Sequence, residues 1–507
     1  MSSARRRPGD VDADAPSRPV DAPSASPPPP ARSNDALFTA ALFALALLPR
    51  LYVALAWARE PVWDGHYYDF GARRIAAGFG YSDDVVVGGV SRWHPWCHYP
   101  VGYSAFLGLI YRFFSDGPRA APVANAVVGA LVAVVAHRLA RHAMSPARAR
   151  LAGLLVALSP ELIAYAALLM TEPLASLGPL AAAWVAVATR RRRPLLGALA
   201  AGALVGLTTL VRPQTVLVAP ALGLIALDGN AFRTTWRRAL GVAAVGTAAC
   251  LAVVAPWTVR NCRVMDGCAF VSTNAGWNLA IGAFPRATGR FETLRGSDGC
   301  PVVTGQVQQD RCWGALGLAY IRSDTRRWLG LVPEKLSQTF DHASFPLGYL
   351  GEADPTRWTE DRKRLGRDWL TRAHGFLLVV AAFVVVSRRP PTKSGRLAQA
   401  GLGLALALAG LYVFGAFGGY EHPFWWFAAA TPLLAGVPLP GRAPLGPVLR
   451  YLLTLYASVV FTHAVFFGED RYHVVLTPVL ALLAAAALPR YPRACGAPRE
   501  SLGTTDA

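Results

Sequence analysis

The chain has 507 residues, of which 53% are hydrophobic and 16% charged, and its mean hydropathy is +0.32. This balance excludes an ordinary soluble protein and is typical of a polytopic membrane protein. The formal net charge of +19 favours a nucleic-acid partner only at first sight. The basic residues fall in short clusters between apolar stretches, and that distribution indicates membrane topology instead.

The chain starts with a polar segment at residues 1–35, which is rich in Pro, Ala, Ser and Asp and has consecutive prolines at 27–30. A segment of this composition buries too little apolar surface to fold, so we expect a disordered cytoplasmic tail. Because the segment lacks an early apolar region, we expect no cleavable signal peptide.

A helix that spans a bilayer needs about 20 mostly apolar residues. The sequence therefore predicts an all-α polytopic membrane protein with about 12 transmembrane helices. They are expected at 36–57, 120–140, 149–169, 173–189, 195–211, 214–228, 239–258, 373–387, 397–416, 425–440, 448–467 and 474–489. The apolar stretch 100–114 is short, and we interpret it as a re-entrant or interfacial helix.

Basic clusters follow every second predicted crossing. They lie at 5–7, 138–150, 190–193, 233–238, 388–396, 442–450 and 490–493. The positive-inside rule then places both termini, including a tail at 490–507, in the cytoplasm of a protein of the inner (plasma) membrane.

This topology divides the chain into membrane and external parts. The membrane parts are a module at 36–258 and C-terminal helices at 373–489. The external parts are a loop at 58–119 and a segment at 259–372, which is long enough for a small folded subdomain.

Five of the seven cysteines lie in the predicted external parts: Cys97, Cys262, Cys268, Cys300 and Cys312. An oxidising compartment permits disulfides there. The four cysteines within 259–372 allow two bridges in three possible pairings. A zinc cluster is the alternative, but the spacing from Cys262 to Cys268, with no histidine nearby, fits zinc poorly.

An acidic residue, Asp64, follows the first span in the motif Trp63-Asp64-Gly65-His66-Tyr67-Tyr68 and starts a predicted amphipathic helix. At that position it is interpreted either as a helix cap or as a functional carboxylate. The aromatic residues nearby, including Tyr67 and the run at 93–100, fit both an interfacial belt and a platform for sugar rings.

A second acidic residue, Glu172, lies in Met170-Thr171-Glu172-Pro173 where a span reaches the same predicted face. Two carboxylates far apart in sequence but at one membrane face indicate a catalytic site. Glu161 lies inside the preceding span, where an ionisable group is costly. It is interpreted either as functional or as locally paired, with Arg50 of the first span as one possible partner.

Three arginines lie on the predicted external side, against the topology rule: Arg212, Arg260 and Arg471. Guanidinium groups bind phosphate through bidentate hydrogen bonds, so convergent arginines predict a site for a lipid phosphate. The alternative is salt bridges to acidic neighbours, namely Glu469, Asp470 or Asp266.

In this order, the elements resemble the membrane-embedded GT-C glycosyltransferases that use polyprenyl-phosphate sugars. The resemblance is closer to bacterial relatives of the dolichyl-phosphate-mannose–protein mannosyltransferases (family 39) and of the aminoarabinose transferase. It spans residues 36 to about 489. The matching motifs are Asp64-X-X-Tyr67, His98-Tyr99-Pro100-Val101-Gly102-Tyr103, Leu169-Met170-Thr171-Glu172, Val211-Arg212-Pro213, Pro256-Trp257-Thr258-Val259-Arg260-Asn261, Asn274-Ala275-Gly276-Trp277-Asn278-Leu279 and Gly468-Glu469-Asp470-Arg471-Tyr472.

The sequence departs from the family pattern at two places. Gly65 stands where the family often has a second acidic residue, and Pro100-Val101 stands where a Pro-Pro pair is common. These differences concern which acceptor is used, more than whether a sugar is transferred.

The resemblance implies a glycosyltransferase that moves a sugar from a polyprenyl-phosphate donor to an acceptor hydroxyl on the external face, with inversion. Asp64 is then the general base, and Glu172 positions hydroxyl groups. Arginine stabilises the leaving phosphate, so neither a metal nor a cofactor is expected. The expected substrate-binding residues are Tyr67, His98, Arg212, Arg260, Arg471 and Tyr472.

Two other functions remain open. One is a polytopic lipid or solute transporter, which predicts paired ionisable residues near mid-membrane and symmetrical halves. The other is an oligosaccharide polymerase or ligase that uses diphosphate-linked donors. The sequence specifies neither the sugar nor whether the acceptor is a protein, a glycolipid or a glycan.

Overall fold

The computed structural model describes residues 32–227, 232–301, 305–387, 392–413, 425–437 and 445–488. The expected tail at 490–507 and nearly all of that at 1–35 lie outside these residues. The chain divides into two units, residues 1–38 and 39–507. Of the first unit the structure describes only the start of α1, and the architecture below is that of the second.

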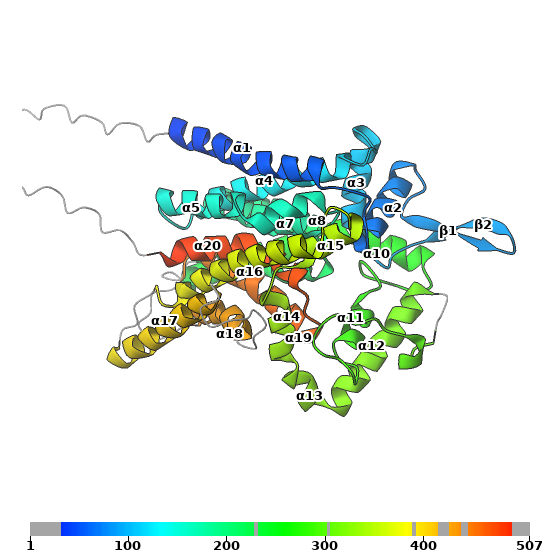
Figure 1. The fold of residues 1–507 in the computed structure, drawn as a ribbon. Coiled ribbons are helices and arrows are strands. Elements are labelled where there is room, and N and C mark those ends of the chain that lie inside the picture. The colour runs from blue at the N-terminus through cyan, green and yellow to red at the C-terminus, as the bar shows by residue number, and fades with distance from the viewer. Residues whose placement is uncertain are drawn as a thin grey trace, which may run out of the picture. The chain divides into compact units, whose positions relative to one another are not determined.

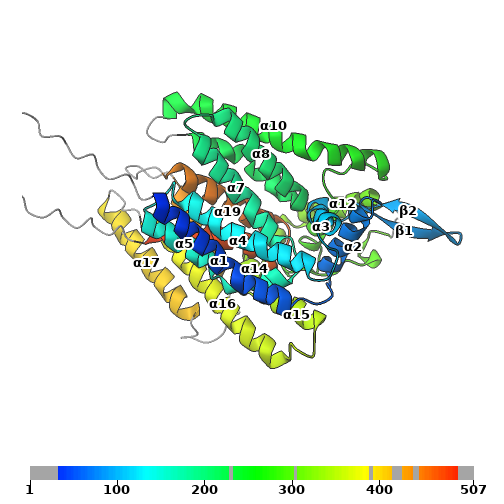
Figure 2. The same cartoon turned by 90° about the horizontal axis from the view of Figure 1, so that it is seen from above.

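The described residues are predominantly helical, as predicted (Figure 1). The longer helices are α1 (Arg32–Ala56), α4 (Ala120–Ala140), α5 (Pro146–Ala157), α7 (Glu172–Thr189), α8 (Pro194–Val211), α10 (Phe232–Val264), α16 (Glu360–Ala382), α17 (Lys393–Val413), α19 (Pro447–Val465) and α20 (Thr477–Ala487). Short helical segments join them: α6 (Pro160–Ala164), η1 (Tyr165–Ala167), η2 (Pro213–Val218), η3 (Pro220–Leu222), α9 (Gly223–Ala226), η6 (Phe383–Val385), α18 (Trp425–Ala430), η7 (Thr431–Gly436) and η8 (Asp470–Leu476). Figure 2 shows α8 beside α10 along one flank and α16 beside α17 along the other.

Seven described segments are long and apolar enough to cross a membrane: Asp35–Ala56, Ala120–Ala140, Pro194–Val211, Thr234–Val264, Glu360–Val385, Pro447–Val465 and Asp470–Ala487. A pair bent by 47°, Pro146–Ala157 with Pro160–Ala167, is an eighth candidate. These segments identify a multi-pass membrane protein, because helices satisfy their own backbone polar groups in lipid.

The expected count of about 12 spans is not reached within the described residues. The stretch 173–189 is a helix, α7, but is not among the seven. The stretch 214–228 corresponds to a shorter apolar segment, Pro213–Ala226. The stretches 397–416 and 425–440 run partly outside the described residues.

The span predicted at 149–169 is bent in the structure, and a buried arginine of α1 holds the bend. Helix α5 ends at Ala157, and α6 restarts after Ser159, whose hydroxyl accepts a hydrogen bond from the Leu162 amide. Arg50 donates to the carbonyls of Val156 and Ala157 at 3.0 and 2.7 Å. Its guanidinium thus satisfies the Ala157 carbonyl at the end of α5 and is a second donor to the Val156 carbonyl, which also accepts from the Ser159 amide at 3.4 Å. Arg50 therefore stabilises the helix break. It does not pair with Glu161, which was the partner considered from the sequence.

The loop predicted at 58–119 contains α2 (Asp64–Ala76), the hairpin β1 (Ser82–Val87) and β2 (Val90–Pro95), and α3 (Val101–Phe113). Gly88 and Gly89, both with positive φ, form the hairpin turn. With 13 residues, α3 is too short to span a bilayer, as predicted for 100–114. It crosses α8 closely at Gly102, where a Cβ atom would lie 2.5 Å from the Leu210 carbonyl carbon.

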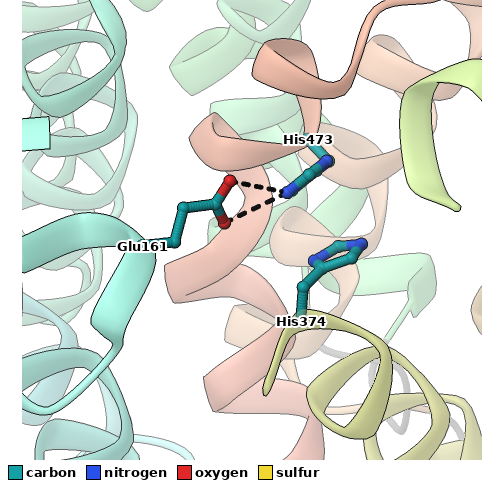
Figure 3. Close-up of side chains that lie close together, drawn as sticks. All are labelled: Glu161, His374 and His473. Atoms are coloured by element: carbon teal, nitrogen blue, oxygen red, sulfur yellow. Dashed lines mark hydrogen bonds and ion pairs between the residues drawn. The ribbon is translucent and has the colours of Figure 1, made fainter. Parts of the chain in front are cut away.

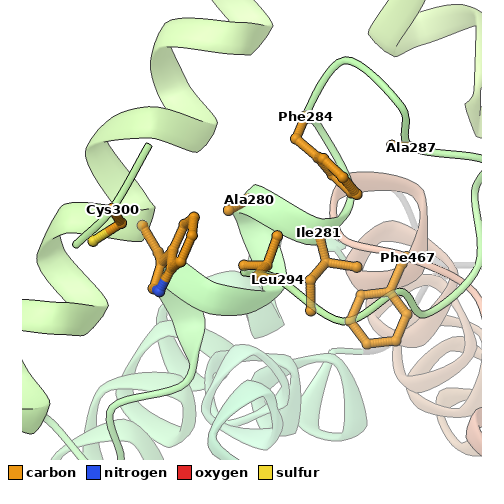
Figure 4. Close-up of a cluster of buried hydrophobic side chains, with 8 residues drawn as sticks. Ala280, Ile281, Phe284, Ala287, Leu294, Cys300 and Phe467 are labelled. Atoms are coloured by element: carbon orange, nitrogen blue, oxygen red, sulfur yellow. The ribbon is translucent and has the colours of Figure 1, made fainter. Parts of the chain in front are cut away.

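The segment predicted at 259–372 contains further short helices: α11 (Ala275–Ile281), η5 (Gly296–Asp298), α12 (Gln306–Ser323), α13 (Thr325–Gly330), α14 (Val332–Phe340) and α15 (Phe345–Ala353). It has a buried cluster of its own (Figure 4), made of Ala280, Ile281, Phe284, Ala287, Leu294, Cys300, Trp313 and Phe467. Phe467 comes from the link between α19 and η8, so this cluster ties the segment to the C-terminal helices.

The four cysteines of that segment form two disulfides, Cys262–Cys268 and Cys300–Cys312. This is one of the three pairings that the sequence left open. Cys97 is free and buried, and burial raises the pKa of its thiol to about 11.

Candidate functional site

Asp64 is the first residue of α2, and the residue before it has an unusual backbone. Trp63 has φ of 51° and is the one non-glycine residue with positive φ among those described. Such a conformation costs about 1–3 kcal/mol and persists only where packing holds it. The Trp63 ring packs against Phe345 and Tyr349 of α15, with ring centroids 5.6 and 5.9 Å away. Helix α15 therefore fixes the backbone that presents Asp64.

The Asp64 carboxylate is bound by two side chains distant in sequence. Its Oδ1 accepts a hydrogen bond from the Tyr99 hydroxyl at 2.9 Å. Its Oδ2 lies 2.5 Å from the Arg471 guanidinium, which also contacts Glu469 at 2.5 Å. Capping of α2 thus does not account for the position of the Asp64 side chain.

The two carboxyl groups on Arg471 differ in pKa. Burial alone would raise the pKa of Asp64, but its ion pair with Arg471 and its hydrogen bonds lower the pKa below the ordinary value. For Glu469, burial prevails over Arg471 and raises the pKa. Asp64 is therefore ionised at neutral pH and able to accept a proton, whereas Glu469 is the first of the two to protonate as the pH falls.

A second ion pair lies beside the first. Glu172, the first residue of α7, is fully buried and pairs with Arg212 at the end of α8. The Nε of Arg212 also donates to the Thr171 hydroxyl at 3.1 Å. Pro173 at the start of α7 lacks an amide proton, which suits the first turn of a helix.

The Tyr472 ring links the two ion pairs. The guanidinium carbons of Arg471 and Arg212 lie 5.1 and 5.6 Å from its centre. His463 stacks on the same ring, with centroids 4.1 Å apart. The structure thus brings five predicted site residues together: Asp64, Glu172, Arg212, Arg471 and Tyr472.

A partly open cavity begins at this site. Arg212, Tyr472 and His463 of the site line it. Its other lining residues come from α7, the α8–α9 link, α19 and η8, and are largely apolar: Ala175, Pro179, Gln214, Thr215, Leu455, Ser458, Val459 and Val475. A cationic group next to apolar side chains suits a ligand with an anionic head and a hydrocarbon tail.

The predicted aromatic residues form a second wall next to Asp64. Tyr67 stacks on Tyr99 with centroids 5.3 Å apart and lies 5.8 Å from Trp96. His98 packs edge-on against Tyr99 and Trp277. Burial lowers the pKa of His98 although the charge of Asp64 acts against it. Tyr67 is half-exposed, so this wall faces outward.

Arg260 does not join the other two arginines. It donates to the carbonyls of Trp96 and Tyr81 at 3.0 and 2.8 Å, and its guanidinium lies 4.7 Å from the Trp257 ring centre. It fastens the two ends of the β1–β2 hairpin to α10. A role in phosphate binding stays a prediction for Arg260.

Gly65 occupies a place with no room for a side chain. A Cβ atom there would lie 2.3 Å from the Tyr349 hydroxyl and 3.1 Å from the Leu169 carbonyl. The same hydroxyl accepts a hydrogen bond from the Val62 amide at 3.2 Å. Packing of α15 on this turn therefore accounts for glycine at this position.

Sequence reasoning missed one contact of Asp64. Tyr99 lay within the quoted motif His98-Tyr99-Pro100, but nothing in the sequence linked its hydroxyl to a carboxylate 35 positions earlier. The salt-bridge alternative had named Glu469 among the partners of the arginines. The sequence thus predicted two possible partners for Arg471, a carboxylate and a substrate phosphate, and did not choose between them.

Residues 98–259 match the family model described as dolichyl-phosphate-mannose-protein mannosyltransferase. This match confirms the resemblance to a GT-C glycosyltransferase family. The matched region begins at His98 and includes Glu172 and Arg212. No curated protein matches the chain.

Two solved structures align with most of the chain. The archaeal oligosaccharyltransferase AglB from Archaeoglobus fulgidus, in complex with an inhibitory peptide and a dolichol-phosphate, is 15% identical over 89% of this chain, with a TM-score of 0.45. ArnT from Cupriavidus metallidurans, bound to undecaprenyl phosphate, is 16% identical over 90% of this chain and 78% of its own, with a TM-score of 0.36. The chain spans about half the length of AglB, since 50% of that chain is covered.

Proposed function

We propose that the protein is a membrane glycosyltransferase that moves a sugar from a polyprenyl-phosphate donor to an acceptor hydroxyl at the external face of the inner membrane. One observation carries this proposal. Two carboxylate–arginine pairs, Asp64–Arg471 and Glu172–Arg212, flank the ring of Tyr472. Acidic groups for an acceptor and cations for a phosphate are thus within one site.

In the proposed reaction Asp64 accepts the proton of the acceptor hydroxyl as general base. The acceptor oxygen attacks the anomeric carbon as the bond to the phosphate oxygen breaks, and the configuration inverts. The polyprenyl phosphate leaves with the bonding electrons and needs no proton, because a phosphate anion is weakly basic. Arg471 and Arg212 stabilise its charge.

Arg471 has a double role in this scheme. In the free protein it neutralises Asp64 and Glu469, and a bound donor phosphate competes with both carboxylates for its five N–H groups. Release from Arg471 raises the pKa of Asp64, because the burial that remains disfavours its charge. Donor binding thereby makes Asp64 a stronger base just when one is required.

Glu172 and the aromatic wall have positioning roles in this proposal. Glu172 is fully buried and orients Arg212, and the proposal extends that role to hydroxyl groups of the bound substrates. Tyr67, His98 and Trp96 offer aromatic faces beside Asp64 for the sugar or the acceptor. The proposal places the start of the polyprenyl chain along the apolar residues that line the small cavity at Tyr472, among them Pro179, Leu455 and Val459.

A conservative variant of Asp64 tests the proposal. Asp64→Asn keeps the size of the side chain and removes the base, so we expect transfer to fall by about 10²- to 10⁴-fold. Asp69→Asn is the matched control on the same helix, since Asp69 pairs with Arg73 and accepts from Tyr111 away from the site. The control is expected to keep its activity within a few-fold.

The measurement is mass spectrometry of the envelope glycans and glycoproteins from a deletion strain, complemented with each variant. We expect one sugar to be missing in the deletion strain. Wild type and Asp69→Asn are expected to restore it, and Asp64→Asn is not. Full restoration by Asp64→Asn would contradict the assignment of Asp64 as the base. Transfer by the purified protein in detergent, where no gradient exists, separates an enzyme from a transporter.

A further inference from the structure

Helix η8, which carries Arg471, also contributes to a second cluster of polar side chains that the proposed reaction does not use. It consists of Glu161 from α6, His374 from α16 and His473 from η8 (Figure 3). Their exposed fractions are 3%, 4% and 0%. One possible ligand atom of each residue lies within 4.8 Å of the others. Three ionisable groups this deeply buried need a partner of opposite or complementary character.

The hydrogen bonds of the two histidines show which ring nitrogens carry protons. His473 Nδ1 lies 2.7 Å from the Thr339 carbonyl, and His374 Nε2 lies 3.0 Å from the Phe340 carbonyl. A carbonyl oxygen only accepts, so both nitrogens must donate. In the neutral imidazoles, the opposite nitrogens, His473 Nε2 and His374 Nδ1, then present lone pairs.

The lone pair of His473 Nε2 then faces the lone pairs of a carboxylate, and that of His374 Nδ1 faces no donor. His473 Nε2 lies 3.0 and 3.1 Å from the two oxygens of Glu161. His374 Nδ1 is buried and has no hydrogen-bond partner among the described residues. The two rings stack with centroids 3.6 Å apart. Electron-rich atoms of all three side chains therefore face one small volume.

A single proton accounts for only part of this arrangement. Placed on His473 Nε2, it makes an imidazolium–carboxylate pair with Glu161. The lone pair of His374 Nδ1 remains unsatisfied in the interior, which costs about 1–3 kcal/mol. A second proton on His374 places two positive rings in a stack. One divalent cation, in contrast, satisfies all three groups at once.

We propose that Glu161, His374 and His473 bind one divalent transition-metal ion of the zinc type. Two imidazole nitrogens and one carboxylate are a ligand set that suits Zn²⁺. In such sites the far nitrogen of each histidine usually donates to a carbonyl or carboxylate, and here Phe340 and Thr339 provide those carbonyls. Ligand atoms on a tetrahedral ion are about 3.3 Å apart, and the lone pairs of two stacked rings are nearly parallel. Binding therefore draws the three side chains together and turns the two rings out of their stack.

The metal has a structural role in this proposal. It connects α6, α16 and η8, and through the Thr339 and Phe340 carbonyls also the end of α14. Arg471 precedes His473 by two positions in the same short helix, η8. A cation at His473 therefore fixes the segment that aims Arg471 at Asp64. The metal site itself stands whether or not the proposed reaction is correct.

Metal analysis of the full-length protein tests the proposal. The protein is purified in detergent from cells supplied with zinc, and metal bound per chain is measured by inductively coupled plasma mass spectrometry after gel filtration. We expect one zinc ion per chain in the wild type and at least a tenfold loss in Glu161→Gln and His374→Gln. X-ray absorption of the wild type is expected to show nitrogen and oxygen ligands at about 2.0–2.2 Å with imidazole scattering.

The matched control is His137→Gln. His137 is likewise fully buried and bonded through Nδ1 to a carbonyl, that of Ala149, but it lies in α4 outside the cluster. This variant is expected to keep the full metal content. Zinc content that is equal in all variants would show an adventitious ion and overturn the proposal.

If the variants fail to fold, metal binding by the wild-type protein alone tests the proposal. The protein is stripped with a chelator, and its thermal unfolding is followed as ZnCl₂ is added back. A rise in the unfolding temperature that saturates at one ion per chain is expected. A wild-type protein with no bound metal and no response to added zinc would show that a proton alone joins His473 to Glu161, against the proposal.

Discussion

At the scale of single residues, the site is built from groups whose ordinary behaviour is altered by their neighbours. Asp64 is partly buried yet stays ionised, because Arg471 and Tyr99 stabilise its charge. Trp63 holds a backbone conformation that only packing against α15 makes acceptable. Gly65 has no Cβ atom and therefore leaves room for the Tyr349 hydroxyl. Helix α15, which carries no predicted site residue, thus positions the candidate base.

Gly65→Ala tests this dependence on α15. The new methyl group overlaps the Tyr349 hydroxyl, so we expect a loss of about 1–3 kcal/mol in stability. Tyr349→Phe removes that hydroxyl, and the double variant is expected to recover part of the loss. Thermal unfolding in detergent is the measurement. Gly401→Ala is the control, since nothing lies near a Cβ atom there and alanine favours its helix.

Lys335 gives a prediction about pH. It is fully buried and donates to the Val465 carbonyl at 3.2 Å, and burial, helped by the charge of Arg327, lowers its pKa from 10.5 to about 8. Below pH 8 the folded state bears the cost of a buried charge. Between pH 8 and 10.5 the unfolded chain binds one more proton than the folded one, so stability rises with pH by up to about 3 kcal/mol.

Lys335→Met removes this dependence. We expect the variant to gain on wild type at pH 7 and to lose that advantage as the pH approaches 10. Unfolding temperatures measured across this range check it. Lys363→Met is the control, because Lys363 is partly exposed and pairs with Glu360. A wild-type stability that does not change between pH 8 and 10 would contradict the prediction.

At the scale of elements, the break between α5 and α6 positions both a helix end and an acidic side chain. The break frees carbonyls for Arg50, and it aims Glu161 of α6 at His473. The chain then continues through η1 to Glu172 at the start of α7. The position of Glu161 therefore depends on the bend.

Arg50→Met tests the element. It leaves the Ala157 carbonyl without its donor and the Val156 carbonyl with the Ser159 amide alone, and we expect a loss of about 1–3 kcal/mol. Arg50→Lys retains the charge but offers no fork of donors, so it is expected to recover only part. Hydrogen exchange of residues 156–164 and thermal unfolding are the measurements. Tyr52→Met, at an exposed position of α1, is expected to be neutral.

At the scale of the whole molecule, the predicted topology puts the hairpin and the site on the external side and the α7–α8 link in the cytoplasm. Labelling of cysteines introduced one at a time tests this topology. Ser91 is exposed in β2 and Arg191 is exposed between α7 and α8, so the variants are Ser91→Cys and Arg191→Cys. We expect a membrane-impermeant maleimide to label only the first in intact cells. The native Cys97 and Cys250 are buried and contribute little background. Labelling of Arg191→Cys alone would invert the topology.

The sequence by itself determined the class of protein. Apolar runs indicated the helices, and the length of 100–114 alone predicted a helix too short to span, as α3 is. Asp64, Glu172, Arg212 and Arg471 stood out because charged groups beside apolar runs are costly, and Tyr472 was added by the motif that resembles the family. These signals are local, and a single sequence is enough to reveal them.

Only the tertiary structure decided which of these residues meet. It joined Asp64 to Arg471 across 407 positions and His473 to Glu161 across 312, and it turned Arg260 toward the hairpin. The choice among disulfide pairings and the role of Arg50 were also tertiary. Such contacts depend on how helices pack and where they break, and their energy arises between side chains that the sequence keeps far apart. The sequence therefore named the residues, and packing assigned their partners.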